Sequence, residues 1–388
     1  MLDQIEKYLS KLTEDRSSCP DNQAIAAQDD VVVFSGEPLF SHIAKETLKS
    51  LGCFAVVVAK PALPFADYLL QRARDHECKI TPRDTESRTF LHDIPIIRKK
   101  ELENNPARAI SARLADRRGV IAEGIGIIAA GTLTVEQAYI NWSSVFHSTF
   151  VKYLSDILNE GFTLSGEADA FISFRNDWLR PLTSEGLEFR KGPIKTKEDI
   201  LDEVIRVGRY VERRGLVDSF FGNISYACGN LLYISQTASS LDNLSGCIDP
   251  VPFDDSSTVG ITASSELAAH RAIIEKTGCR AILHGHPRFA VVMSMLCGER
   301  ESCAISDCWK DCPKIRFLGN TPVVAGEIGA GGLAKNVSPV IGKTGQAIVY
   351  GHGVFSIGGS DFAEAFRGMI NVENFCRNEY FKLLDNKN

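Results

Sequence analysis

Continuous apolar runs and helical patterns follow each other along the chain and predict an α/β protein. The first twelve residues carry apolar side chains at helical spacing, which predicts a short amphipathic helix. Residues 31–34 and 54–58 are continuous apolar runs, which are typical of buried strands. Farther along, Thr196 precedes an acidic turn and then apolar positions at helical spacing, so we expect a helix to begin there.

The chain is predicted to contain two globular regions joined by a connector. Residues 162–195 include Pro181, Gly186 and a Gly-Pro pair, which are typical of a linking segment. We therefore expect a first lobe over residues 1–161 and a second lobe over residues 196–388.

The two regions resemble each other in sequence, at nearly constant spacing. Residues 124–131 align without gaps with residues 351–358, an offset of 227 (351 − 124). Residues 52–61 align with residues 278–287 at an offset of 226 (278 − 52). Because the matching blocks keep their order, we interpret the second lobe as a repeat of the first.

Composition excludes some classes of function. The net charge is −6, which gives no support for binding nucleic acid. The N-terminus lacks the basic and apolar regions of a signal peptide, and no apolar run approaches the length of a membrane span. The eleven cysteines are therefore expected to be reduced thiols in the cytoplasm.

Three of the eight histidines stand in glycine-flanked, strand-like settings. His284 and His286 are separated by one residue, and such residues of a strand point to the same face. A third imidazole, from His352, would leave one coordination position open, which is typical of a catalytic zinc site. Ordinary core or surface histidines are the alternative for a His-x-His pair taken alone.

Small, hydroxyl-rich loops precede the histidine pair. They are Gly-Leu-Val to Gly-Asn-Ile-Ser at residues 215–225, Thr-Ala-Ser at 237–239 and Ser-Ser-Glu at 264–266. The two serines of the last loop can cap a helix whose exposed N–H groups favour an anion such as phosphate. Glu266 would then lie in the first helical turn, although a plain N-cap with an acidic first turn explains this segment equally well. His270, one turn later, is expected to orient the site.

In this order, the motifs resemble those of the class II aldolase/adducin family, which includes L-fuculose-phosphate aldolase. The resemblance covers about residues 197–385. It implies an α/β fold with two tandem class II aldolase-like α/β/α lobes and mainly antiparallel central sheets. The first lobe resembles the same fold without its beginning and without its functional residues, since Val58, Lys60 and Ile125 stand at the three histidine positions.

The resemblance also implies roles for individual residues. His284, His286 and His352 match the family's zinc ligands, and Glu266 matches its acid/base carboxylate, which can also approach the metal. The positions that contact phosphate in the family are matched by Asn223, Thr237, Ser264 and Ser265. Ala238 replaces the family's usual glycine, which puts the phosphate loop in doubt if that position requires a positive φ.

Four cysteines lie close together in sequence after the histidine pair. A structural Zn²⁺ held by four thiolates is one interpretation, and a surface insertion with reactive or buried thiols is the other. The residues are Cys297, Cys303, Cys308 and Cys312.

The resemblance implies a lyase that depends on Zn²⁺ or another divalent metal. Such an enzyme would cleave a small phosphorylated sugar, or a related hydroxy-carbonyl compound, by a retro-aldol reaction through a metal-stabilised enediolate. Epimerase, dehydratase and decarboxylase activities of the same family are alternatives, as is a non-catalytic, adducin-like binding protein. We expect a cytoplasmic homo-oligomer, either a dimer with a pseudo-fourfold ring or a tetramer.

Overall fold

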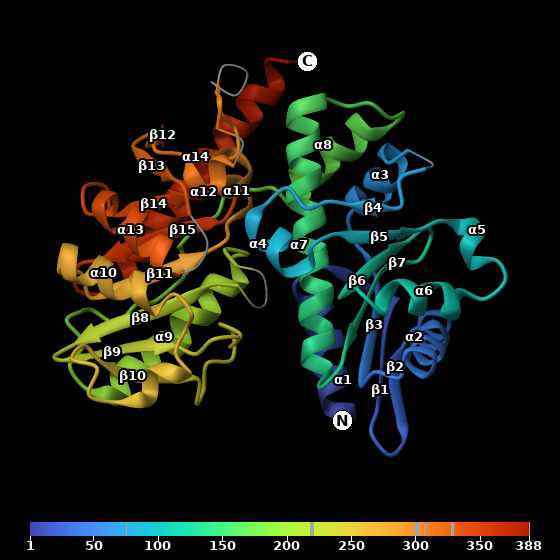
Figure 1. The fold of residues 1–388 in the computed structure, drawn as a ribbon, viewed down its shortest axis with the longest axis horizontal. Helices are drawn as coiled ribbons and strands as arrows, with labels where there is room; N and C mark the ends of the chain where they lie inside the picture. Colours follow the sequence, from blue (N-terminus) through green and yellow to red (C-terminus); the bar gives the residue numbers. More distant parts are fainter. Residues whose placement is uncertain (75, 218–220, 299–302, 306, 327–329, 388) are drawn as a thin grey trace. The chain divides into compact units, whose positions relative to one another are not determined.

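The computed structural model divides the chain into two compact units, Met1–Arg180 and Pro181–Asn388. The division falls within the connector expected over residues 162–195. Figure 1 shows the elements of both units along the chain. The structure describes residues 1–74, 76–217, 221–298, 303–305, 307–326 and 330–387.

The first unit contains one mixed sheet with helices around it. Its described strands form a seven-stranded sheet in the order β2-β1-β3-β7-β6-β5-β4, in which only the described pair β5–β6 is parallel. The elements are α1 (Leu2–Glu14), β1 (Ser18–Gln28), β2 (Val32–Gly36), α2 (Pro38–Leu51), β3 (Ala55–Pro61), α3 (Phe65–Arg72), β4 (Lys79–Ile80), α4 (Thr85–Leu91), β5 (Ile94–Ile97), α5 (Lys99–Leu102), α6 (Pro106–Leu114), β6 (Gly119–Ala122), β7 (Gly126–Gly131), α7 (Val135–Glu160) and α8 (Glu167–Asp177).

The sequence predicts α1 and β3 correctly, and residues 32–34 of the apolar run do lie in a strand, but the prediction that this strand is buried is wrong. The apolar run at residues 31–34 belongs to the edge strand β2, where Phe34 is 45% exposed, and Val31 before it is 67% exposed. The buried strand is β1, which lies one position farther in. Its central residues 24–27 are fully buried, but three of them are alanines, so the segment gives only a weak hydrophobic signal.

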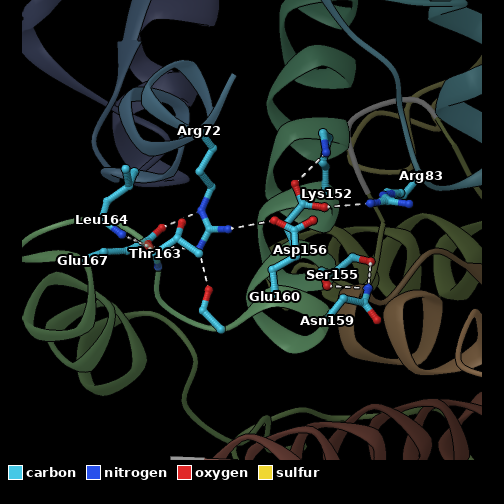
Figure 2. Close-up of polar contacts among 11 residues, drawn as sticks. Arg72, Arg83, Lys152, Ser155, Asp156, Asn159, Glu160, Thr163, Leu164 and Glu167 are labelled. Atoms are coloured by element: carbon cyan, nitrogen blue, oxygen red, sulfur yellow. Dashed lines mark hydrogen bonds and ion pairs between the residues drawn. The ribbon is translucent and has the colours of Figure 1, made fainter. Parts of the chain in front are cut away.

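A buried ion pair holds α8 against the rest of the first unit (Figure 2). Arg72 at the end of α3 donates two hydrogen bonds to Glu167 at the start of α8, both at 2.8 Å. The Glu167 carboxylate, fully buried, also accepts from the backbone N–H groups of Thr163 and Leu164. Arg72 further donates to the exposed carboxylate of Glu160 at 3.2 Å. The first half of the expected connector is therefore fixed to this unit.

We expect Glu167→Ala to lower the free energy of unfolding by about 3–5 kcal/mol, because it leaves the Arg72 guanidinium buried without its main partner. Glu160→Ala is the matched control, since Glu160 contacts the same arginine but its side chain is 52% exposed. We expect that change to cost about 0–1 kcal/mol. Urea denaturation followed by circular dichroism measures both, and equal losses would contradict the assignment.

The second unit contains a larger sheet of the same kind. Its described strands form an eight-stranded sheet in the order β10-β9-β8-β11-β15-β14-β13-β12, with the described pair β13–β14 parallel. The elements are α9 (Lys197–Arg213), β8 (Asn223–Cys228), β9 (Leu231–Ser235), β10 (Ile248–Pro252), the 3-10 helix η1 (Thr258–Ile261), α10 (Leu267–Thr277), β11 (Ala281–Gly285), α11 (Arg288–Ser294), α12 (Cys308–Asp311), β12 (Arg316–Leu318), β13 (Thr321–Val324), α13 (Ala330–Ile341), β14 (Gln346–Val349), β15 (Gly353–Gly358) and α14 (Phe362–Asp385).

Helices cover both faces of the second sheet, so its central strand β11 is buried on each side. Ala281 and Leu283 pack with residues of α9 and α14, whereas Ile282 packs with residues of α10 and α13. Successive strand residues point to opposite faces, so His284 lies on the α10 face. As predicted, α9 begins after Thr196, whose side chain caps it by accepting from the N–H of Asp199.

The two sheets share one strand order, which indicates a second lobe of the same topology. β1, β3, β7 and β6 correspond to β8, β11, β15 and β14, with the same parallel or antiparallel partners. Val58 pairs with Ile128 in the first sheet, and His284 pairs with Phe355 in the second. These pairs are separated by the same offsets, 226 (284 − 58) and 227 (355 − 128), that relate the two halves of the sequence. In the described part of the chain, no helix is both long enough and apolar enough to cross a membrane.

Candidate metal centre

The three histidines come together at the ends of two paired central strands. His284 lies near the end of β11, His286 follows that strand directly, and His352 directly precedes β15. The antiparallel pairing places Gly285 opposite Val354, so the start of β15 lies beside the end of β11. One nitrogen of each imidazole lies within 4.8 Å of the others.

A close approach of the two backbones explains why Gly353 follows His352. A Cβ atom at Gly353 would lie 2.3 Å from the carbonyl oxygen of Gly285 and 2.5 Å from a ring carbon of His286. It would also lie 3.0 Å from a ring carbon of His284. A side chain at this position would therefore displace either the strand or the imidazoles.

The buried His284 is oriented so that it can act as a ligand. Its Nδ1 lies 3.1 Å from the carbonyl oxygen of Val354, which can only accept, so Nδ1 carries the proton and Nε2 presents a lone pair. Burial lowers the pKa of His284 to about 3, which keeps the ring neutral. Its ring also stacks on Phe355, with centroids 4.1 Å apart.

The spacing of the nitrogens fits a small divalent cation. The Nε2 atoms of His284 and His286 are 3.0 Å apart. Tetrahedral zinc with bonds of about 2.0–2.1 Å sets neighbouring nitrogens about 3.3 Å apart. The donor set, three imidazoles, also suits zinc and other first-row transition metals.

Glu266 lies beside two of the three imidazoles. Its two carboxylate oxygens are 3.5 Å from Nε2 of His284 and 3.6 Å from Nε2 of His352. The side chain is 13% exposed, and burial raises the pKa of its carboxyl, while His352 and the Asn223 amide act to lower it. Glu266 is the N-cap residue of α10, one position before the first turn in which the sequence analysis expected it.

Three buried side chains are linked by hydrogen bonds in a series that ends on Glu266. The Asn223 amide donates to a Glu266 oxygen at 2.8 Å. The carbonyl oxygen of Asn223 hydrogen-bonds Nε2 of His270, whose Nδ1 lies 2.6 Å from the hydroxyl of Ser225. His270 thus lies where an orienting residue would. Ser225 is not among the site residues expected from the sequence, although it stands two positions after Asn223 in the same strand.

The other expected phosphate-contacting residues lie around the same end of α10. The Thr237 hydroxyl donates to the carbonyl of Ala263 at 2.9 Å, and the N–H of Ser264 donates to the carbonyl of Ser235. These bonds bring the Thr237 loop next to Ser264 and Ser265. The hydroxyl of Ser264 accepts from the N–H of Glu266, and the phosphate-binding role of these residues stays a prediction.

The four clustered cysteines are free thiols. Cys308 donates to the carbonyl of Ile305, and Cys312 donates to that of Lys314. Among the residues that the structure describes, the histidines form the only group of three or more converging ligands. Residues 299–302 and 306, between these cysteines, lie outside the described residues, and the second metal site stays a prediction.

The second unit is thus a layered α/β domain in which three histidines converge as candidate metal ligands. Residues 202–380 match the family model described as "Class II Aldolase and Adducin N-terminal domain". The C-terminal half of this chain is therefore a class II aldolase/adducin domain, as the sequence motifs predict.

Solved structures match about half of the chain, and no curated protein matches it. The L-fuculose-1-phosphate aldolase of Thermus thermophilus is 22% identical, with a TM-score of 0.39, over 48% of this chain and 96% of that chain. YgbL of Klebsiella pneumoniae, described as a candidate aldolase/epimerase/decarboxylase, is 21% identical, with a TM-score of 0.39, over 48% and 91%. The sugar-phosphate aldolase of Thermotoga maritima is 15% identical, with a TM-score of 0.36, over 48% and 96%.

Ala238 adopts a left-handed backbone conformation, with a φ of 61°. This is the position at which the sequence has alanine in place of the family's usual glycine. That conformation costs a non-glycine residue about 1–2 kcal/mol, while glycine loses about 0.4–1 kcal/mol more on folding. We therefore expect Ala238→Gly to raise the free energy of unfolding by about 0.5–1 kcal/mol. Ala268→Gly, on the exposed side of α10, is the control and should lower it by about 1 kcal/mol. Chemical denaturation measures both free energies of unfolding. A destabilised Ala238→Gly variant would show that the backbone at Ala238 is not strained.

Proposed function

We propose that this protein is a lyase that depends on a divalent metal and cleaves a carbon–carbon bond in a small phosphorylated hydroxy-carbonyl compound. The observation that carries the proposal is the placement of Glu266 against the three-histidine group, with oxygens 3.5 and 3.6 Å from two of the ligand nitrogens. An ordinary structural histidine cluster has no need of a carboxylate at that position. Membership of the C-terminal half in the class II aldolase/adducin family supports the proposal.

Different residues of this chain would bind the metal and transfer the proton. His284, His286 and His352 would hold the metal, which when bound supplies Lewis-acid stabilisation of negative charge on a substrate oxygen. Glu266 would move the proton on the atom next to the substrate carbonyl. Its partial burial favours this role, because burial raises the pKa of the carboxyl and so makes it a stronger proton acceptor.

The substrate phosphate would bind at the end of α10. Thr237, Ser264 and Ser265 gather there, and the first backbone N–H groups of a helix favour an anion. This assignment supports a phosphorylated substrate over an uncharged one. The homo-oligomer expected from the family resemblance stays a prediction, which light scattering can test.

We expect His352→Ala to abolish metal binding at this site, because it removes one of three ligands. Elemental analysis should find one equivalent of metal less in the variant than in the parent, in a background where Cys297, Cys303, Cys308 and Cys312 are serine. His42→Ala, an exposed change on α2, is the control and should keep the metal. Unchanged metal content in His352→Ala would refute the site.

We expect Glu266→Gln to lower kcat by about 10²–10⁴-fold on the true substrate, because glutamine cannot transfer a proton. A panel of ketose and aldose phosphates, assayed for retro-aldol cleavage, should first identify that substrate with the parent protein. Metal content should stay unchanged in the variant. A parent that cleaves no member of the panel would favour epimerase, dehydratase or decarboxylase chemistry, and a metal-loaded parent inert in all four assays would favour a binding protein.

A further inference from the structure

We propose that Ser225, His270 and Asn223 form a buried hydrogen-bond relay whose purpose is to position Glu266. The inference rests on the proposed role of Glu266 as the group that moves a proton. The three residues of the relay are positioning residues, since each acts through the next.

When Glu266 is ionised, the form in which it can accept a proton, the hydrogen-bonding groups of the relay match in one direction. The ionised Glu266 carboxylate is an acceptor, so the Asn223 group that faces it at 2.8 Å must be the NH₂. The carbonyl oxygen of Asn223 then faces Nε2 of His270, which must carry a hydrogen. In the neutral ring Nδ1 is consequently an acceptor, and the Ser225 hydroxyl 2.6 Å away donates to it. All three donors point toward Glu266.

The relay is enclosed by protein. Ser225 and His270 are fully buried, and Asn223 is 6% exposed. Burying polar groups of this kind costs free energy unless every group is paired, and their mutual bonds strengthen one another where water is excluded. A chain of paired groups that ends on Glu266 fixes the carboxylate in one orientation.

The first lobe indicates that the fold itself does not require this relay. Ala24 pairs with Val58 as Asn223 pairs with His284, and Ala26 pairs with Val56 as Ser225 pairs with Ile282. The first lobe therefore has alanine at both strand positions.

The first lobe also has apolar residues at the helix positions that correspond to His270 and Glu266. α2 ends at a left-handed Gly52 and α10 ends at a left-handed Gly278, so positions can be counted back from these caps. Ala44 then matches His270, and Phe40 matches Glu266. All four first-lobe residues, Ala24, Ala26, Ala44 and Phe40, belong to one apolar core cluster. The relay and Glu266 are thus present together in one lobe and absent together from the other, as expected if the relay serves the carboxylate.

The first test is the hydrogen position on His270, which needs neither substrate nor activity. In the full-length protein labelled with ¹⁵N-histidine, NMR should show a neutral His270 ring with its hydrogen on Nε2. In Asn223→Ala the Nε2–H resonance should shift upfield, because its acceptor is lost. A ring with its hydrogen on Nδ1, or an Nε2–H resonance unmoved in Asn223→Ala, would overturn the proposal.

The second test is a double-mutant cycle on the reaction. His270→Leu should lower kcat by at least tenfold with KM and metal content unchanged, because Asn223 loses the partner that fixes its amide. His270→Gln, which keeps a donor of similar reach, should recover most of the loss. In the Asn223→Ala background, His270→Leu should have no further effect on kcat. Additive losses would overturn the relay.

The control for general damage to the helix is Ile273→Ala. Ile273 is fully buried on α10 but belongs to the apolar cluster on that face. This variant should lose stability while kcat stays within twofold of the parent. If the parent shows no activity at all, the proposed function fails, and the NMR test still decides the relay.

Discussion

The candidate site depends on the antiparallel register between β11 and β15. That register places Gly285 opposite Val354, so the residue that follows one strand and the residue that precedes the other lie side by side. Because side chains of a strand alternate between faces, a slip of one residue would turn His284 to the α9 and α14 face, away from Glu266. The apolar residues on both faces of β11 resist such a slip, since each face packs into its own helical layer. Site geometry and core packing are therefore fixed together.

The sequence could predict that these histidines converge, because the spacing of two of them has a local geometric meaning. His284 and His286 share a face whatever the rest of the fold does, and the ordered motifs around them identify the family. The partner of Asn223 could not be predicted, because its amide can reach either a phosphate or Glu266, and only the pairing of β8 with β11 settles its place. The first strand was missed for a different reason. Its burial rests mostly on alanines, which are small enough for the centre of a sheet but add little to a hydrophobic pattern.

The two lobes show how one topology accommodates either a polar site or an apolar core. In the second lobe, Glu266, His270 and Asn223 are buried with their polar groups paired to one another. In the first lobe, an apolar side chain stands at each corresponding position, which removes the need for such pairing and gives a continuous hydrophobic cluster. Replacing buried charged groups by well-packed apolar ones of similar volume is often neutral or stabilising. Stability therefore does not explain the polar residues of the second lobe, which points to function as the reason for them.

The glycines around the histidines require a separate explanation. Gly126 stands in the first lobe where Gly353 stands in the second, and a Cβ atom there would lie 2.6 Å from the Cα of Lys60 and 2.9 Å from the carbonyl of Ala59. Ala59 and Lys60 occupy the positions of Gly285 and His286, so the same close approach of two backbones exists in a lobe that lacks all three histidines. The glycine after the third ligand position is thus a requirement of the fold, and it alone does not indicate a metal. A metal centre is indicated instead by the three imidazoles, which the first lobe lacks, and by the carboxylate placed against them.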